Sequence, residues 1–126
     1  MLKHGFKKML AEANAVIDTI SVDDALALVD DPNAVIIDVR DGGERQPTSA
    51  IKGSIHASRG FLEFKADPES PMYDSAIDAN KKLVLYCASG GRSALAAKTL
   101  IDMGFSNVCH IAGGFAAWKD AGGPIE

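Results

Sequence analysis

The segment "LVLYCASGGRS", residues 83–93, leads from four apolar positions through a cysteine into a glycine-rich loop. The run Lys82–Cys87 has the continuous apolar pattern of a parallel strand that is buried on both faces. After the loop, residues 93–103 carry apolar side chains at helical spacing, and Gly104 is placed to end that helix. Open parallel sheets bind ligands at the carboxyl ends of their strands. The segment therefore predicts an α/β sheet with Cys87 at its ligand-binding edge.

Strands and helices alternate along the rest of the chain. Apolar runs predict further strands at Ala34–Val39, Gly53–Ala57 and Asn107–Ile111. Helices are predicted at residues 5–18, 22–29 (after Ser21 as N-cap) and 115–121, with a helical turn at 59–64. Segments 41–49 and 66–80 are polar and rich in turn formers, and are predicted to be loops. This order predicts an α/β fold with a small, mostly parallel sheet flanked by helices.

The composition is that of an ordinary globular domain, with 126 residues, 47% hydrophobic and 24% charged. The net charge of -4 argues against nucleic acid as a partner, because phosphate binding needs a basic surface. No apolar run approaches the roughly 20 residues that a membrane span needs. No apolar stretch follows the first lysines as it would in a secretory signal. We therefore expect a cytoplasmic protein that binds neither nucleic acid nor a membrane.

Three features of the loop after Cys87 favour negative charge on its sulfur. Gly90 and Gly91 allow backbone conformations that point consecutive N–H groups inward. The N-terminus of the next helix and the side chain of Arg92 add positive charge. Together they predict a pKa of Cys87 below the unperturbed value of ~8.5, and hence a nucleophilic thiolate. The alternative is a buried structural cysteine beside a tight turn.

The second cysteine, Cys109, provides an internal comparison. It lies in the predicted strand at 107–111 with no glycine loop and no arginine, so we expect it to fill the core. Two cysteines do not make a disulfide framework. The spacing of Cys87, Cys109, His56 and His110 matches no zinc-ligand pattern, so we expect no metal site.

Three segments of the chain resemble the rhodanese domain, a sulfurtransferase module. "VIIDVRDGGE" (35–44) is similar to the family's strand that ends in Asp-x-Arg with a glutamate after it. "CASGGRS" (87–93) is similar to its six-residue active-site loop, and "IAGGFAAWKDAGGPI" (111–125) to its closing segment. The resemblance implies a rhodanese domain over residues 20–126, with residues 1–19 as an N-terminal helical extension. We expect this extension to pack on the domain, with a partner-binding or membrane-surface helix as the alternative.

The resemblance implies a thiosulfate sulfurtransferase-type enzyme that works through a persulfide on Cys87 and needs no cofactor. Cys87 would take a sulfane sulfur from thiosulfate or a thiol persulfide and pass it to cyanide or a thiol. Arg92 would bind an anionic donor and the leaving sulfite. The remaining substrate-binding residues of the loop would be Ala88, Ser89, Gly90, Gly91 and Ser93. A protein could also serve as the sulfur donor or acceptor.

One departure from the family concerns the pocket charge. Ala88 stands where the family often has a basic or bulky residue, so one positive charge is missing, which puts thiosulfate as the preferred donor in doubt. Arg59 is the candidate replacement for this charge at the substrate site.

The role of Asp38 is open between bracing the cysteine loop and a structural ion pair. For Arg40 we expect a structural ion pair with Glu44. We expect His56 and His110 to be structural histidines, with a general base as the alternative, and Trp118 to anchor the core.

Two other functions compete with sulfur transfer. A cysteine phosphatase has five residues between its cysteine and arginine, whereas only four separate Cys87 from Arg92, which makes a cradle suited to one sulfur atom. A rhodanese-fold sulfur carrier or protein-binding module with little turnover of its own is the other alternative.

Overall fold

β4 (Lys82–Tyr86) lies in the middle of a five-stranded sheet in the computed structural model, which describes residues 1–126. All neighbouring strands are parallel, in the order β1-β5-β4-β2-β3. The other strands are β1 (Asp18–Ile20), β2 (Ala34–Asp38), β3 (Ile55–His56) and β5 (Val108–Ile111). The predicted α/β fold with a parallel sheet is thereby confirmed.

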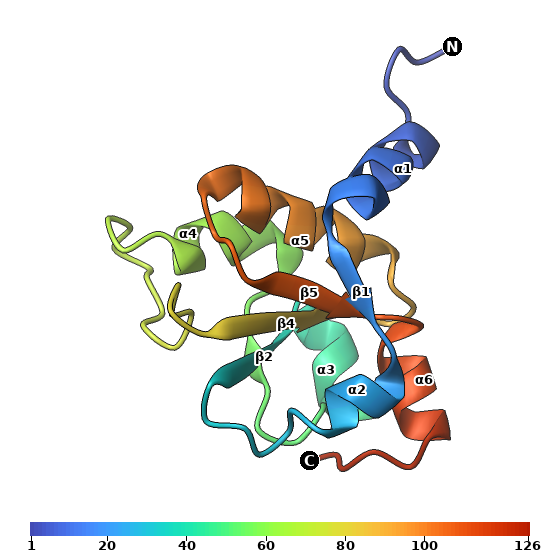
Figure 1. The fold of residues 1–126 in the computed structure, drawn as a ribbon, viewed down its shortest axis with the longest axis vertical. Helices are drawn as coiled ribbons and strands as arrows, with labels where there is room; N and C mark the ends of the chain where they lie inside the picture. The colour runs from blue at the N-terminus through green and yellow to red at the C-terminus, as the bar shows by residue number, and fades with distance from the viewer.

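Helices cover both faces of this sheet (Figure 1). On one face lie α1 (Phe6–Val16), α4 (Leu62–Ala66) and α5 (Gly91–Met103), and on the other α2 (Val22–Leu26) and α6 (Gly114–Asp120). A short 3-10 helix, η1 (Arg59–Phe61), precedes α4. α1 packs against α5 and buries Ala13 there, as expected for a helix packed on the domain. No helix has the length and apolar character that crossing a membrane would require.

The side chains of β4 alternate between two apolar cores. Leu83 and Leu85 join the core beneath α1, α4 and α5, whereas Val84 and Tyr86 join the core around Trp118 of α6. A strand covered on both faces has no polar side, which explains the continuous apolar run in the sequence. Trp118 is fully buried in the second core, as predicted, and donates its indole N–H to the Pro124 carbonyl at 3.0 Å.

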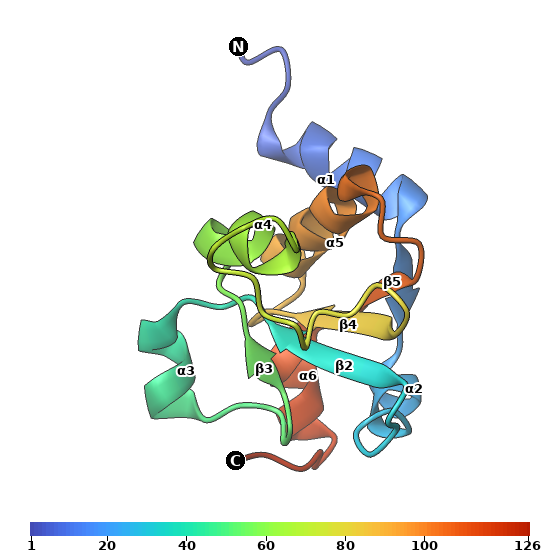
Figure 2. The same ribbon diagram turned by 90° about the vertical axis from the view of Figure 1, so that its left-hand side faces the viewer.

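The predicted loop at residues 41–49 is wrong, because residues 42–48 form helix α3 (Gly42–Thr48). Two glycines and Pro47 obscure the helix in the sequence. The Glu44 carboxylate accepts a hydrogen bond from the Asp41 N–H at 3.2 Å, which closes the first turn. Figure 2 shows α3 standing beside β3 at the end of the sheet. The spacing Asp-x-x-Glu was the local signal for this helix.

The predicted helix at residues 5–18 is too long at its end, because Asp18 already belongs to β1. β1 is an edge strand of three residues that pairs with β5. It carries Asp18 and Thr19 exposed, so it lacks the apolar run that marks a buried strand. The second helix ends at Leu26, three residues before its predicted end. The other predicted strands and the helices α5 and α6 lie within two residues of their expected bounds.

A buried carboxylate at the end of β2 ties α3 to the sheet. Asp38 is fully buried and accepts hydrogen bonds from the Arg40 backbone N–H and guanidinium at 2.9–3.2 Å. It also accepts from Arg45 of α3 at 2.9 Å and from the Tyr86 hydroxyl at 3.0 Å. The expected Arg40–Glu44 pair is wrong, because the buried Arg40 guanidinium pairs with Asp38 instead.

The charge of Asp38 is stabilised in the fold. Burial alone would raise the pKa of Asp38, but the hydrogen bonds and charge of Arg40, with Arg45, outweigh it and lower that pKa. A carboxyl whose pKa is lower in the folded state contributes stability above its unfolded pKa of ~3.9 and loses it as the pH falls through the folded value.

We predict that Asp38→Asn lowers the free energy of unfolding by about 3–5 kcal/mol at neutral pH, because it leaves Arg40 buried without a counter-ion. Urea unfolding followed by Trp118 fluorescence measures this. Asp30→Asn, at an exposed position, is the matched control and should change stability by less than about 0.5 kcal/mol. The difference between Asp38→Asn and wild type should shrink in acid. A difference of equal size at all pH values would contradict the role of the charge.

Candidate functional site around Cys87

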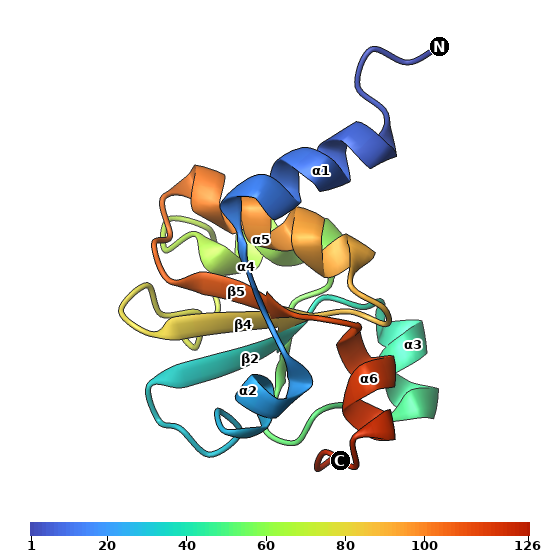
Figure 3. The ribbon, with the colours of Figure 1, turned by 45° about the vertical axis from the view of Figure 1, so that its right-hand side comes forward.

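Cys87 is the first residue after β4, and α5 begins four residues later at Gly91. Figure 3 places α3, α6 and the start of α5 at the edge where β4 and β5 end. Gly90 has φ +116°, a left-handed conformation that glycine adopts readily. This conformation turns the chain back over the strand end, so the residues between β4 and α5 curl around the cysteine sulfur.

The backbone of this loop points its donors at Cys87. The N–H groups of Gly90 and Ser93 lie 3.1 Å and 3.3 Å from Sγ. The Ser93 hydroxyl oxygen lies 3.6 Å from Sγ. The inward N–H groups expected from the sequence are therefore present in the structure.

These donors set the ionisation of Cys87. Burial raises the pKa of a thiol, and Cys87 is only 1% exposed. Hydrogen bonds from the Ser93 hydroxyl and from the N–H groups of Ser93, Gly90 and Ser89 outweigh burial and lower the pKa of Cys87 below its ordinary value. The sulfur lies at the base of the loop, with exposed Ser89 and Gly91 at its rim.

Cys109 shows what burial does without such donors. It is 1% exposed in the core around Trp118 and receives no hydrogen bond in the structure. Burial raises the pKa of Cys109 to about 11. Its thiol stays protonated and unreactive at neutral pH, in agreement with the core position expected from the sequence.

The start of α6 holds the cysteine loop from the other side. The Phe115 N–H donates to the Cys87 carbonyl at 2.8 Å, and the Ala116 N–H donates to the Ala88 carbonyl at 3.1 Å. Gly114 permits this close approach, because a Cβ there would lie 2.5 Å from the Cys87 carbonyl oxygen. Gly114 also has φ +60°. The Gly113–Gly114 pair of the closing segment is therefore a docking point for the loop.

Arg92 lies at the rim of the loop but its guanidinium is engaged. Its Nη1 and Nη2 atoms donate to the two carboxylate oxygens of Glu44 at 2.5 Å and 2.9 Å. The hydrogen bonds from Arg92 lower the pKa of Glu44, and Glu44 raises the pKa of Arg92. α3 thus supplies a counter-ion to the loop arginine, a pairing that the sequence analysis missed.

Two residues assigned to the site from the sequence lie apart from the loop. Asp38 makes its contacts with Arg40, Arg45 and Tyr86, and forms no hydrogen bond with the loop. Arg59 pairs with Glu63 at 3.0 Å and donates to the Thr99 hydroxyl of α5 at 3.0 Å. Arg59 is engaged in these two contacts and does not replace the charge missing at Ala88.

The structure places a different cation beside Ala88. A cavity of about 270 Å³ lies next to the loop and has the exposed Lys119 of α6 at its wall. Lys119 forms no salt bridge, and its ammonium lies 5.7 Å from the centre of the Phe115 ring. The lining residues are Arg40, Glu44, Thr48, Ala88, Phe115, Ala116 and Lys119. No local pattern relates Lys119 to Ala88, because only the docking of α6 brings them together.

The two histidines are held by hydrogen bonds. His56 Nε2 lies 2.6 Å from the Arg40 carbonyl oxygen. His110 is 4% exposed, and its Nδ1 lies 2.8 Å from the Ser93 hydroxyl that contacts the sulfur. Neither imidazole forms a hydrogen bond with Cys87. The Ser93 hydroxyl nevertheless connects His110 to the sulfur, because it lies within reach of both.

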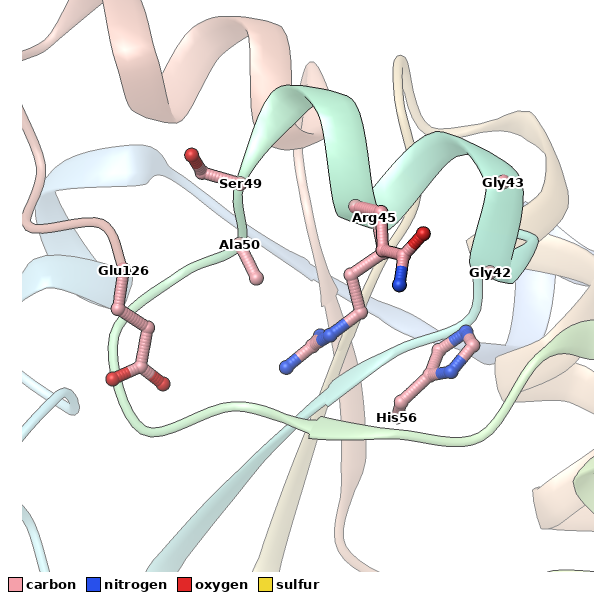
Figure 4. Close-up of a pocket in the computed structure, with 8 residues that line it drawn as sticks. Gly42, Gly43, Arg45, Ser49, Ala50, His56 and Glu126 are labelled. Carbon is pink, nitrogen blue, oxygen red and sulfur yellow. The ribbon is translucent and has the colours of Figure 1, made fainter.

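The largest cavity, of about 660 Å³, is not at the cysteine. It lies between α3 and the end of the chain, with the Arg45, His56 and Glu126 side chains around it (Figure 4). Arg45 is already bonded to Asp38 and Ser54, and Glu126 accepts from the Gly53 N–H. Cys87 does not line this cavity. No group of three or more His, Cys, Asp or Glu side chains in the structure is arranged to hold a metal ion.

Comparison with known sequences identifies the class of domain. Residues 21–121 match the family model of the rhodanese-like domain. The thiosulfate sulfurtransferase GlpE of Actinobacillus succinogenes is 31% identical over 108 residues, which cover 85% of this chain and 88% of that protein. The tRNA uridine(34) hydroxylase of Salmonella heidelberg is 32% identical over 124 residues. That match covers 91% of this chain but only 33% of the hydroxylase.

Solved structures give the same picture. A Rhodopseudomonas palustris protein of unknown function, described as a possible tyrosine phosphatase, has a TM-score of 0.94 and 50% identity. The match covers 100% of this chain and 97% of that one. The polysulfide-sulfur transferase of Wolinella succinogenes has a TM-score of 0.75 and 33% identity, and the match covers 96% of this chain and 86% of that one.

We predict that iodoacetamide alkylates Cys87 and spares Cys109 in the folded protein. The reagent attacks the thiolate, so the rate at Cys87 should rise with pH and reach half of its maximum below ~8.5, where an ordinary thiol is half ionised. Cys109, with a pKa of about 11, should stay unlabelled over this range. Mass spectrometry of wild type, Cys87→Ser and Cys109→Ser measures both rates. Faster labelling of Cys109 than of Cys87 would show that Cys87 is not the reactive thiol.

Proposed function

Since the chain belongs to the rhodanese family of sulfurtransferase domains, we propose that it moves sulfane sulfur through a persulfide on Cys87. The donor would be thiosulfate or a thiol persulfide, and the acceptor cyanide or a thiol. The observation that carries this proposal is the pair of loop N–H groups at 3.1 Å and 3.3 Å from the buried sulfur. Such donors hold a thiolate ready without a base.

The chemistry has two steps at the same sulfur. In the first, the Cys87 thiolate attacks the outer sulfur of the donor, an S–S bond forms, and sulfite or a thiolate leaves with the electron pair of the broken bond. In the second, the acceptor attacks the outer sulfur of the persulfide, and Cys87 leaves as the thiolate. The outer sulfur stands about 2 Å from Sγ and carries the negative charge. The amides around Cys87 would stabilise this charge in both steps.

The surroundings of Ala88 favour a thiol persulfide over thiosulfate. Arg92 is paired with Glu44, so it offers an anion less charge than a free guanidinium would. The cavity beside Ala88 has apolar walls at Phe115 and Ala116 and the unpaired Lys119 at its rim. An organic persulfide with an apolar stem and an anionic end matches this lining better than the small dianion thiosulfate does.

A sulfur carrier or docking module is the second candidate function. A module that only binds a partner has no need of a buried cysteine with inward amides, and this loop keeps both. A carrier loaded by a protein donor would use the same persulfide. The two cases differ in whether small donors load Cys87.

Two similar proteins are named for other activities. The activity of the Salmonella hydroxylase does not carry over to this chain, because the chain matches only 33% of that protein. The Rhodopseudomonas palustris protein is described as a possible tyrosine phosphatase. With four residues between Cys87 and Arg92, and Gly90 and Ser93 closing on the sulfur, the loop fits one sulfur atom better than a phosphate. Turnover of p-nitrophenyl phosphate that depends on Cys87 would favour the phosphatase instead.

We predict that Cys87→Ser abolishes both persulfide formation and cyanide-dependent formation of thiocyanate. Wild-type protein treated with thiosulfate or glutathione persulfide, freed of excess donor and weighed by mass spectrometry should gain one sulfur atom. Cys109→Ser is the matched control and should load and turn over as wild type does, since its thiol is in the core. Loading by the thiol persulfide alone would identify the donor class. No loading by either donor would contradict small-donor sulfur transfer.

We predict that Arg92→Ala reduces kcat/KM for thiosulfate by about tenfold or more, and for an uncharged organic persulfide by much less. The reason is the loss of a charged hydrogen-bond donor at the rim of the loop. Arg59→Ala removes the same charge away from the loop and is the control. Steady-state kinetics with both donors measure the ratio. Equal losses for the two donors would remove the anion-binding role of Arg92.

A further inference from the structure

A chain of hydrogen-bonding side chains leads from the cysteine sulfur to the outer edge of the sheet. Ser93 Oγ lies 3.6 Å from Cys87 Sγ and 2.8 Å from His110 Nδ1. On the other side of the ring, His110 Nε2 lies 3.0 Å from the hydroxyl of Thr19. Ser93 and His110 are buried, whereas Thr19 is exposed on the edge strand β1. Cys87 is only 1% exposed, and this chain of side chains connects its sulfur to solvent on the side away from the loop rim.

We propose that Ser93, His110 and Thr19 form a proton relay that couples the ionisation of Cys87 to solvent at the sheet edge. His110 and Thr19 act in it as positioning residues, because neither touches the sulfur. The relay deepens the proposed function, which requires a thiolate at Cys87, and concerns how that thiolate forms and persists.

Each hydrogen bond in the relay reverses its direction when Cys87 ionises. In the thiol state the Cys87 S–H donates to Ser93 Oγ, the Ser93 hydroxyl donates to Nδ1, and the Nε2–H of His110 donates to Thr19. On ionisation the S–H bond breaks and its proton joins Ser93 Oγ, while the former hydroxyl proton passes to Nδ1. The Nε2 proton passes to the Thr19 hydroxyl, and the proton of that hydroxyl leaves to water. One proton has then left Cys87, and His110 is neutral before and after.

The tautomer of His110 decides what Ser93 does for the sulfur. With the proton on Nε2, the Ser93 hydroxyl turns to Nδ1. With the proton on Nδ1, the ring donates to Ser93 Oγ, and the hydroxyl is free to donate to the thiolate. The competing acceptor, the Gly90 carbonyl, lies 3.2 Å from Ser93 Oγ. A hydroxyl that itself accepts a hydrogen bond is the stronger donor to a negative charge.

The charges around the relay leave this role to neutral groups. The charge of Cys87 acts on Arg92 of α5, which is paired with Glu44 of α3. No charged side chain of β1, β4, α5 or α6 forms a hydrogen bond or salt bridge with His110. Burial alone lowers the pKa of His110, which keeps the ring neutral as the relay requires. Cys109, the neighbour of His110 in β5, has no such chain and stays protonated.

The test titrates Cys87 in the Cys109→Ser background, using the rate of iodoacetamide alkylation against pH. Ser93→Ala should raise the Cys87 pKa by about one unit, because it removes the direct donor. His110→Phe should lower the acid constant of Cys87 several-fold. His110→Asn, whose side chain can donate to Ser93, should recover part of this loss. Thr19→Val should have a smaller effect and lower the acid constant of Cys87 about twofold.

Thr19→Val keeps the shape of an exposed side chain, so it remains testable if the His110 variants unfold. Thr99→Val, which removes a hydroxyl elsewhere on α5, is the matched control and should leave the Cys87 pKa unchanged. An unchanged Cys87 pKa in folded His110→Phe or in Thr19→Val overturns the relay. The alkylation assay needs no sulfur donor, so it separates the two proposals. If the wild-type protein is loaded with sulfur but the relay variants leave the Cys87 pKa unchanged, only the relay is contradicted. If the variants shift the Cys87 pKa but no donor loads the wild-type protein, only sulfur transfer is contradicted.

Discussion

A buried sulfur can hold negative charge only if hydrogen-bond donors replace the water it has lost, and this requirement organises the structure around Cys87. Most of the donors are backbone N–H groups, whose directions depend on the path of the chain, and the remaining donor is the Ser93 hydroxyl. The left-handed turn at Gly90 and the immediate start of α5 fix that path. Cys109, equally buried but without donors, is held protonated.

Several distant elements keep the loop in this shape. α6 binds the carbonyl groups of Cys87 and Ala88, at a distance that only Gly114 allows. α3 holds Arg92 through Glu44, and α3 is itself fixed to the sheet by the Arg45–Asp38 pair. The loop is thus connected through α3 to the buried carboxylate of Asp38. Asp38 itself forms no hydrogen bond with the loop.

The two sides of Cys87 serve different purposes in the function that we propose. The rim of the loop, with Arg92 and the cavity beside Lys119, faces the sulfur donor and acceptor. The inner side, through Ser93 and His110, faces the sheet and reaches solvent at Thr19. A proton path separate from the substrate side would let Cys87 lose its proton while a donor occupies the rim, because the proton would leave at Thr19 and not through the space that the donor fills.

The sequence alone determined the strand that ends in Cys87, the glycine loop and the helix that follows, because these depend on local periodicity and on residues adjacent in the chain. It also distinguished Cys87 from Cys109 by their immediate neighbours. Only the tertiary structure decided the partners of the side chains. Glu44 meets Arg92 across 48 positions, and Arg59 turns to Thr99 across 40. His110 reaches Ser93, and Lys119 approaches Ala88, because β5 and α6 pack beside the loop. No local pattern encodes such meetings, since they arise when the strands pair and the helices dock.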